Sequence, residues 1–124
     1  MTPNVKKIDA IIEAIKAEKI AEFDMQVILQ KDHCGTSGCI AGFYNLLERN
    51  PFQRAFNIIP RKQRCLRQDS PKVQEDFGMT EQELNELFYS AKSTIALHMI
   101  TKDMAIAALE DVKKGEFESW KDYR

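Results

Sequence analysis

Apolar residues recur every three to four positions along most of the chain, which is the spacing of one face of an α-helix. The first such run is Val5, Ile8, Ile12 and Ile15. Thr2 can cap a helix whose first position is Pro3, and the pattern ends between Lys19 and Ala21. The sequence therefore predicts an amphipathic helix at the start of the chain.

Helix signals are stronger in the second half of the chain. Thr80 and Glu83 have the spacing of a capping box in "TEQELNELF". Thr101 can cap the helix of "TKDMAIAALEDVKKG", which Gly115 should end. A shorter helix is predicted to begin after Ser70 and Pro71. These local signals predict three helices, with Gly78 ending the first of them.

The stretch "EFDMQVILQ" alternates apolar and polar residues until Ile28 breaks the pattern, so a short strand and a helix both remain open there. No second convincing strand is present to pair with it. Phe117 and Trp120 are expected to fold back on the core. The predicted fold is mostly α, a single compact helical domain over residues 1–124 with about five to seven helices and at most one short strand.

The stretch "HCGTSGCIAGF" holds two cysteines, three glycines and two hydroxyl side chains in eleven residues. A helix is predicted directly after it, from about Ser37 to Arg49, ending before Asn50 and Pro51. The first amides of a helix have no carbonyl partner within it and can bind a phosphate or carboxylate. A ligand site is therefore predicted at Gly35, Thr36, Ser37, Gly38 and Cys39.

Positive charge is concentrated in residues 49–72, which contain seven bases and one acid, a net charge of +6. The whole chain has a net charge of −1. Arg54, Arg61 and Arg64 could supply guanidinium partners to an anion bound at the helix start. Three interpretations of the basic segment stay open, namely a solvated face, a docking patch for an acidic protein or small anion, and a nucleic-acid interface.

The aromatic residues within this segment affect that choice. Phe52 and Phe56 could stack on bases if they are exposed. Together with Ile59, however, they have the spacing of a buried helix face, and the sequence predicts that they belong to the core. The isoelectric point of about 6.1 is also low for a nucleic-acid binder, so nucleic acid ranks below an acidic partner.

The cysteines suggest a second chemistry. With Thr36 as cap, Cys39 would lie in the first helical turn, where the helix dipole lowers a thiol pKa. A thiol-dependent enzyme using Cys39 or Cys34 with a histidine, either His33 or His98, is therefore the alternative to a binding protein. The spacing of Cys34 and Cys39 is at the loose edge of zinc-site patterns, and neither a metal nor another cofactor is expected.

The string "CGTSGCIAGF", with "FDMQ" before it and "FGMTEQELNELF" after it, resembles a group of small uncharacterised proteins of bacteria and their phages. They share a Cys-Gly-Thr-x-x-Cys-Ile-Ala-Gly core, matched here by Cys34, Gly35, Thr36, Cys39, Ile40, Ala41 and Gly42. The resemblance covers about two thirds of the chain and matches the basic segment least. It implies a small accessory protein, phage-encoded and acting on a host system, and it brings no established activity.

The sequence thus favours a non-enzymatic, cytoplasmic binding protein. Its expected ligand is a phosphate-bearing small molecule or an acidic partner surface at the glycine-flanked helix start. Interaction with a host protein or nucleic acid through the basic segment is a further alternative. No membrane partner is expected, because no apolar run approaches the roughly 20 residues that span a bilayer.

Overall fold

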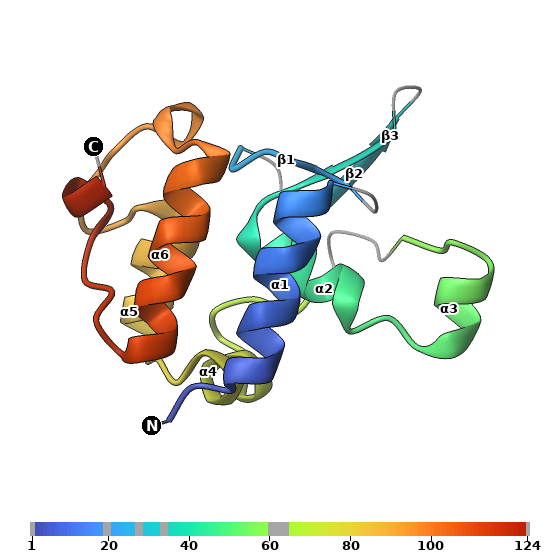
Figure 1. Ribbon diagram of the computed structural model, residues 1–124, viewed down its shortest axis with the longest axis horizontal. Helices are drawn as coiled ribbons and strands as arrows, with labels where there is room; N and C mark the ends of the chain where they lie inside the picture. Colours follow the sequence, from blue (N-terminus) through green and yellow to red (C-terminus); the bar gives the residue numbers. More distant parts are fainter. Residues whose placement is uncertain (1, 19–20, 27–28, 33–34, 60–64, 124) are drawn as a thin grey trace.

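The computed structural model describes residues 2–18, 21–26, 29–32, 35–59 and 65–123. This part of the chain is mostly α-helical, as the sequence predicted, and its six α-helices fall within the predicted range. Two short 3₁₀ helices, η2 and η3, accompany them (Figure 1). The elements are α1 (Val5–Ala17), α2 (Ile40–Leu47), α3 (Pro51–Ala55), α4 (Pro71–Phe77), α5 (Glu81–Tyr89), η2 (Leu97–Met99), α6 (Lys102–Lys114) and η3 (Trp120–Tyr123).

Between α1 and α2 the chain forms a small sheet of β1 (Glu22–Phe23), β2 (Leu29–Asp32) and β3 (Gly35–Gly38). β3 is the central strand, parallel to β1 and antiparallel to β2. This is more strand than the single short one that the sequence allowed. The difference arises because Gly-Thr-Ser-Gly has little strand propensity of its own, and pairing with two other segments determines its conformation.

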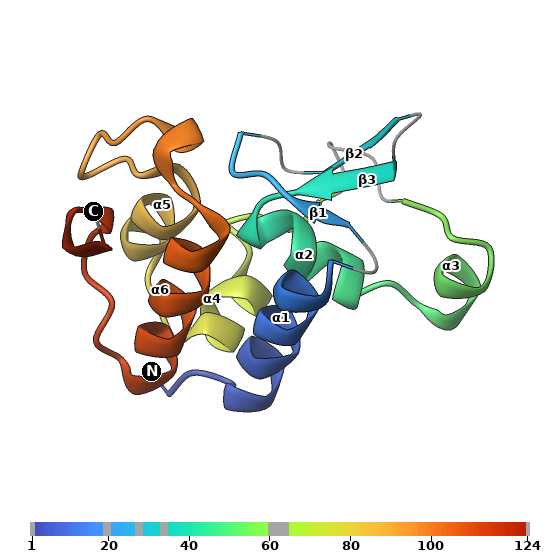
Figure 2. The same ribbon diagram turned by 45° about the horizontal axis from the view of Figure 1, so that its top comes forward.

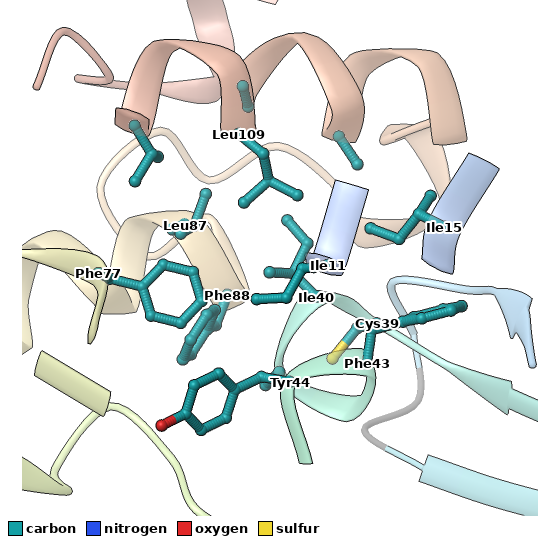
Figure 3. Packing of buried hydrophobic residues seen from close by; sticks show 14 of the residues in the cluster. Ile11, Ile15, Cys39, Ile40, Phe43, Tyr44, Phe77, Leu87, Phe88 and Leu109 are labelled. Atoms are coloured by element: carbon teal, nitrogen blue, oxygen red, sulfur yellow. The ribbon is translucent and has the colours of Figure 1, made fainter. Parts of the chain in front are cut away.

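The core forms around α1, which packs against α2, α4 and α6. The buried residues of α1 lie on one face at helical spacing and are Ile8, Ile11, Ile12 and Ile15. Figure 3 shows how side chains from α1, α2, α4, α5 and α6 meet in this core. Each large side chain buried in this way contributes about 1.5–3 kcal/mol to folding.

The predicted ends of α4, α5 and α6 are confirmed. Thr80 caps α5, and its hydroxyl accepts a hydrogen bond from the Glu83 amide at 3.2 Å while the Glu83 carboxylate accepts one from the Thr80 amide at 3.0 Å. Thr101 caps α6 in the same way, and Gly115 ends it with a left-handed φ of 72°. Gly78 ends α4 with a φ of 64°.

The first helix begins later than predicted. Its cap is Asn4 and not Thr2, because the Asn4 side chain accepts a hydrogen bond from the Lys7 amide at 3.2 Å. The Asn4 amide is in turn bonded to the Asp76 carbonyl of α4 at 2.8 Å. The N-terminal segment therefore lies directly against the end of α4, where a side chain on Gly78 would place its Cβ 2.7 Å from the Pro3 nitrogen.

The C-terminal segment folds back on the core, as predicted. Trp120 is fully buried, and its indole nitrogen donates a hydrogen bond to the Leu87 carbonyl at 3.1 Å. Its backbone amide donates to the Glu86 carboxylate at 2.9 Å. Phe117 packs edge-on against the Trp120 ring, with 5.5 Å between the ring centroids. These contacts attach η3 to α5, and the Tyr123 hydroxyl attaches it to α6 by donating to the Asp111 carboxylate.

Candidate docking surface

The predicted anion site has a different structure. Gly35–Gly38 form β3, so α2 begins at Ile40 and not near Ser37. β3 has a hydrogen-bonded strand on each side. Its backbone groups therefore take part in strand pairing and do not form the N-terminus of a helix. Strand pairing here prevails over the capping tendency of Thr36 and Ser37. The anion-binding prediction assumed that the helix begins at Thr36 or Ser37, and that position is wrong.

The actual start of α2 lies inside the core. Cys39 is the cap residue, with an extended backbone and no capping hydrogen bond from its side chain. Cys39, Ile40 and Ala41 are each no more than 1% exposed. Figure 3 shows the Cys39 side chain among the core residues, together with Ile40 and Phe43. A ligand therefore has no access to the N-terminus of α2 from this side.

The environment of Cys39 also disfavours thiol catalysis. Burial raises the pKa of the Cys39 thiol, and this effect exceeds the opposite one of the Gly42 and Ala41 amides. The thiol is therefore protonated at neutral pH, whereas a nucleophilic cysteine needs an accessible thiolate. Cys34 and His33 lie outside the described residues, and His98, the other histidine of this alternative, is exposed on η2.

Two further findings concern the described residues as a whole. No three histidine, cysteine, aspartate or glutamate side chains in this part of the chain lie close enough together to hold a metal ion. No helix in it has the length and apolar character needed to cross a membrane. The remaining candidate surface is the part of the basic segment that the structure describes.

The most exposed phenylalanines belong to residues 50–59, a segment that we call the arm. The arm contains α3, none of whose residues is buried. In Figures 1 and 2, α3 stands apart from the other helices, at the opposite end of the molecule from α5 and α6. A five-residue helix without a packed face is not stable by itself in water, so local hydrogen bonds must maintain it.

Those local bonds close both ends of α3. At its start, the Gln53 amide donates to the Asn50 side chain at 2.8 Å, and the Asn50 amide donates to the Gln53 side chain at 3.1 Å. At its end, Asn57 has a left-handed φ of 50°. The Ile58 amide then donates to the Gln53 carbonyl at 2.8 Å and the Asn57 amide to the Arg54 carbonyl at 3.3 Å. This pair of bonds is the Schellman motif, which ends many helices.

Two polar side chains attach the arm to α2. Arg49, which is 8% exposed, donates to the Leu46 carbonyl and to the Asn57 side chain, both at 3.1 Å. Arg54 of the arm donates to the Leu47 carbonyl of α2, also at 3.1 Å. The arm therefore has a fixed orientation on the core, and binding through it would cost little conformational entropy.

Phe52 and Phe56 are 63% and 69% exposed. They lie one helical turn apart, their ring centroids are 4.9 Å apart, and the rings are tilted by 45°. We call this pair the aromatic knob. The sequence prediction that both rings belong to the core is wrong, because spacing identifies a helix face but not what that face contacts. Ile59, which was predicted with them, does pack against the core.

Unpaired positive charge lies beside the aromatic knob. Arg54 is exposed, and its guanidinium donates to the Leu47 carbonyl at the end of α2, at 3.1 Å. Within the described ranges, no carboxylate forms an ion pair with Arg54 or Arg49. Burial lowers the pKa of Arg49, and the positive charge of Arg54 lowers it further.

More cations lie beside the start of the arm. Lys7 of α1 forms an ion pair with Glu48, and Lys72 of α4 lies 3.3 Å from Glu48 and 3.2 Å from Asp76. Burial lowers the pKa of Lys7, as do the charges of Lys72 and Arg54. Lys7, Lys72, Arg49 and Arg54 thus outnumber the two carboxylates among them. Arg49 is buried, so we call only Lys7, Lys72 and Arg54 the basic face.

Tyr44 lies within this group of charges. Its hydroxyl donates to the Asp76 carboxylate at 2.5 Å. Burial and this hydrogen bond raise the pKa of Tyr44 far above its ordinary value, so the phenol stays protonated at neutral pH. Burial alone would raise the pKa of Asp76, but the bonds from Tyr44 and Lys72 lower it. These contacts hold α1, α2 and α4 together, and neither group titrates near neutral pH.

The structure does not bring Arg54 to the other residues of the predicted ligand site. Arg54 lies in α3 and Gly35–Gly38 in β3, and both ribbon views place these elements apart. Arg61 and Arg64 lie outside the described residues. The aromatic knob was missed as a surface feature. Asn50 and Pro51 were interpreted only as a helix end, although Asn followed by Pro is also the pattern of a helix start. The short distance from this start to the turn-forming Asn57 could have indicated the knob, because so short a helix has little face to bury.

Comparison with known proteins provides no template for this surface. No protein-family model matches the chain, and no curated protein or solved structure is significantly similar to it. The resemblance of residues 34–42 to small phage and bacterial proteins therefore stays a prediction. The function has to be inferred from the surface itself.

Proposed function

We propose that this chain is a protein-docking protein that inserts the aromatic knob into an apolar hollow on a partner protein. The basic face pairs with carboxylates that surround the hollow. The observation that supports this proposal is the exposure of Phe52 and Phe56, 63% and 69%, on a helix maintained by its own caps. Aromatic and arginine side chains are the residue types most enriched at the energetic centres of protein interfaces.

The expected energetics are those of a transient contact. Full burial of a phenylalanine side chain contributes about 1.5–3 kcal/mol, so the knob can provide a few kcal/mol of binding energy. The arm is already ordered by its caps and by the hydrogen bonds of Arg49 and Arg54, so little of that energy is lost on ordering it. The basic face mainly raises the rate of encounter with an acidic partner, an effect that salt screens.

The arrangement of the rings favours a protein over a nucleic acid. Phe52 and Phe56 contact each other, so they form one apolar projection and not two separate platforms for successive bases. A pair of apolar side chains one helical turn apart is instead the pattern by which a helix anchors in the groove of a partner protein. The phosphate-binding version of the function is not proposed, because Gly35–Gly38 form a strand.

Site-specific photocrosslinking tests the proposal. Phe52 is replaced by benzoylphenylalanine in the full chain, and the matched control carries the same residue at Met99, which is 55% exposed on η2. Each protein is irradiated in a bacterial lysate, and the adducts are digested and sequenced by mass spectrometry. The proposal predicts a protein adduct at position 52 whose crosslinked peptide comes from an acidic, apolar surface, with no equivalent adduct at position 99.

Two further conditions make the result specific. High salt and the Arg54→Glu substitution should both reduce the adduct at position 52, because each removes attraction between the basic face and carboxylates. Either the absence of a protein adduct at position 52 or an adduct that nuclease digests would contradict the proposal. The second of these outcomes would indicate a nucleic-acid interface.

A further inference from the structure

Arg49 is a buried cation without an opposite charge. Only 8% of this residue is exposed, yet no carboxylate in the described part of the chain forms an ion pair with it. Its guanidinium donates from Nε to the Leu46 carbonyl and from Nη1 to the Asn57 side chain, both at 3.1 Å. These acceptors are neutral groups. A buried charge is unfavourable unless an opposite charge accompanies it, so an anion bound at Arg49 would be stabilised.

The end of α2 explains how the fold tolerates this charge. The last carbonyls of a helix carry a partial negative charge that stabilises nearby cations. The Leu46 carbonyl accepts a hydrogen bond from Arg49, and the next carbonyl, that of Leu47, accepts one from Arg54. The two guanidiniums therefore share the last turn of α2. Because a helix end is equivalent to only about half an elementary charge, it compensates these two cations in part.

Arg49 has hydrogen-bond donors left for a further ligand. A guanidinium has five N–H donors, and the bonds to Leu46 and Asn57 use two of them. Within the described ranges, Nη2 of Arg49 has no hydrogen-bond partner. It is not sealed from solvent either, because the sealed side-chain atoms without a partner in this part of the chain belong to three other residues, Gln68, Tyr89 and Ser93. An anion can therefore reach Arg49 from the surface.

Arg49 is bonded directly to the arm that carries the aromatic knob. Its partner Asn57 is the residue after Phe56, and Arg54 belongs to the same short helix as both rings of the knob. A protein that receives the knob therefore comes close to both guanidiniums. The arm is a projection, so the partner has to provide the anion from its own surface beside the apolar hollow.

We propose that Arg49 binds one carboxylate of the partner protein, with the Arg54 guanidinium as a second donor to it. This inference rests on the proposed docking function and identifies the polar contact that makes it specific. The planar guanidinium matches the two oxygens of an aspartate or glutamate side chain. A neutral amide at the same position accepts a hydrogen bond but leaves the buried charge uncompensated, so partners without this acid are rejected.

Nuclear magnetic resonance of the full chain, with sodium acetate as the probe, tests the site directly. Compared with sodium chloride at equal ionic strength, acetate should shift the Arg49 Nε–H signal and the amide signals of Asn57 and Ile58 along a saturable curve. Arg49→Met should abolish the saturable change at both amides. Asn57→Gly is the matched control, because glycine adopts the positive φ of position 57 and removes only the side-chain contact. It should keep the shift of the Arg49 signal.

Photocrosslinking from benzoylphenylalanine at position 52 tests the contact in the complex. Arg49→Met should reduce the protein adduct at least about tenfold, as expected when one partner of a buried charge pair is removed. Two controls should change it less than about twofold. Asn57→Gly breaks the same bond between Arg49 and the arm, and Lys16→Met removes an exposed positive charge from α1. If Arg49 only held the arm in place, Asn57→Gly would reduce the adduct as much as Arg49→Met.

The crosslinked peptide allows a double-mutant cycle. The aspartate or glutamate nearest to the crosslink is replaced by its amide in the partner protein. This change should weaken binding to the wild-type chain at least about tenfold and have little effect on binding to the Arg49→Met chain. Equal effects on both chains, or a phosphorylated side chain at that position of the partner, would contradict the carboxylate contact.

The inference is also overturned if acetate causes no saturable change at Arg49, or if Arg49→Met leaves the adduct unchanged. The docking function survives both of these results, provided that the wild-type chain still forms a protein adduct at position 52. Absence of every protein adduct at that position would instead remove the docking function. The two failures can therefore be told apart.

Discussion

Helices α6 and α3 have similar ends and opposite surroundings. Both begin with a capping box, at Thr101 and Asn50, and both are followed by a residue with positive φ, Gly115 and Asn57. Yet α6 buries four residues in the core, whereas α3 buries none and exposes two phenylalanines. Local hydrogen bonds therefore mark both ends of each of these two helices, whereas only α6 is also held by packing against the core.

The difference shows what each helix contributes. The apolar face of α6 stabilises the fold, so its side chains are needed for folding. The apolar face of α3 adds no core contact, and removing it should leave the fold unchanged. A helix that is ordered without packing and keeps its aromatic rings in water is suited to contact another molecule.

The largest effect should come from the packed region. Trp120→Ala removes a fully buried indole and its hydrogen bond to the Leu87 carbonyl. The free energy of unfolding should fall by about 3–5 kcal/mol, the usual cost of replacing a buried aromatic side chain with alanine. Urea denaturation followed by circular dichroism measures it. A loss below about 1 kcal/mol would mean that η3 is not part of the packed region.

A smaller loss is expected for Glu86→Gln. The buried Glu86 carboxylate accepts hydrogen bonds from the amides of Lys92, Ser93 and Trp120, at 2.7, 2.9 and 2.9 Å. Bonds to a charged group contribute about 1.5–3 kcal/mol each, and the glutamine keeps part of them, so a loss of about 2 kcal/mol is expected at neutral pH. The matched control is Glu13→Gln, at an exposed position, which should change the unfolding free energy little.

The same carboxylate predicts a pH dependence. Burial would raise the pKa of Glu86, but the hydrogen bonds that it accepts lower it below the ordinary glutamate value. Because the folded pKa lies below the unfolded one, this stabilisation is complete above the unfolded pKa of about 4.3 and disappears as the pH falls through the folded pKa. Glu86→Gln should flatten that acid limb of a stability-against-pH curve. An unchanged limb would show that other carboxylates cause it.

Tyr44→Phe should cost less again. The substitution removes the hydroxyl that bonds to Asp76 at 2.5 Å, but Lys72 still pairs with the Asp76 carboxylate. The expected loss is about 1.5 kcal/mol, the low end of the range for one hydrogen bond to a charged group. A urea titration at neutral pH measures it, with wild type as reference. A loss as large as that of Trp120→Ala would show that the contacts among α1, α2 and α4 depend on this hydroxyl.

The sequence predicted the elements whose signals are local. The caps of α5 and α6 lie within a few residues of the helices that they begin or end, so Thr80, Thr101 and Gly115 were identified correctly. The strand at Gly35–Gly38 was not identified, because its conformation depends on pairing with β1 and β2. The start of α2 was therefore placed too early, and the anion site that depended on it was misplaced as well.

The candidate surface was predicted in its charge but not in its form. The concentration of bases around Arg54 is visible in the sequence and indicated an acidic partner. The periodicity of Phe52 and Phe56 was also visible, but a regular spacing is the same for a face that packs on the core and for one that faces water. Only the tertiary structure, in which α3 stands apart from the core, distinguishes these cases.

The aromatic knob should contribute least to stability, and measuring its contribution tests the contrast between α3 and α6 most directly. The measurement is urea denaturation of the F52A/F56A double variant beside wild type, at low protein concentration and high salt so that association does not contribute. If the knob has no part in the fold, the two free energies of unfolding should agree within about 0.5 kcal/mol. A loss of several kcal/mol would show that the rings are buried in solution and would contradict the docking surface.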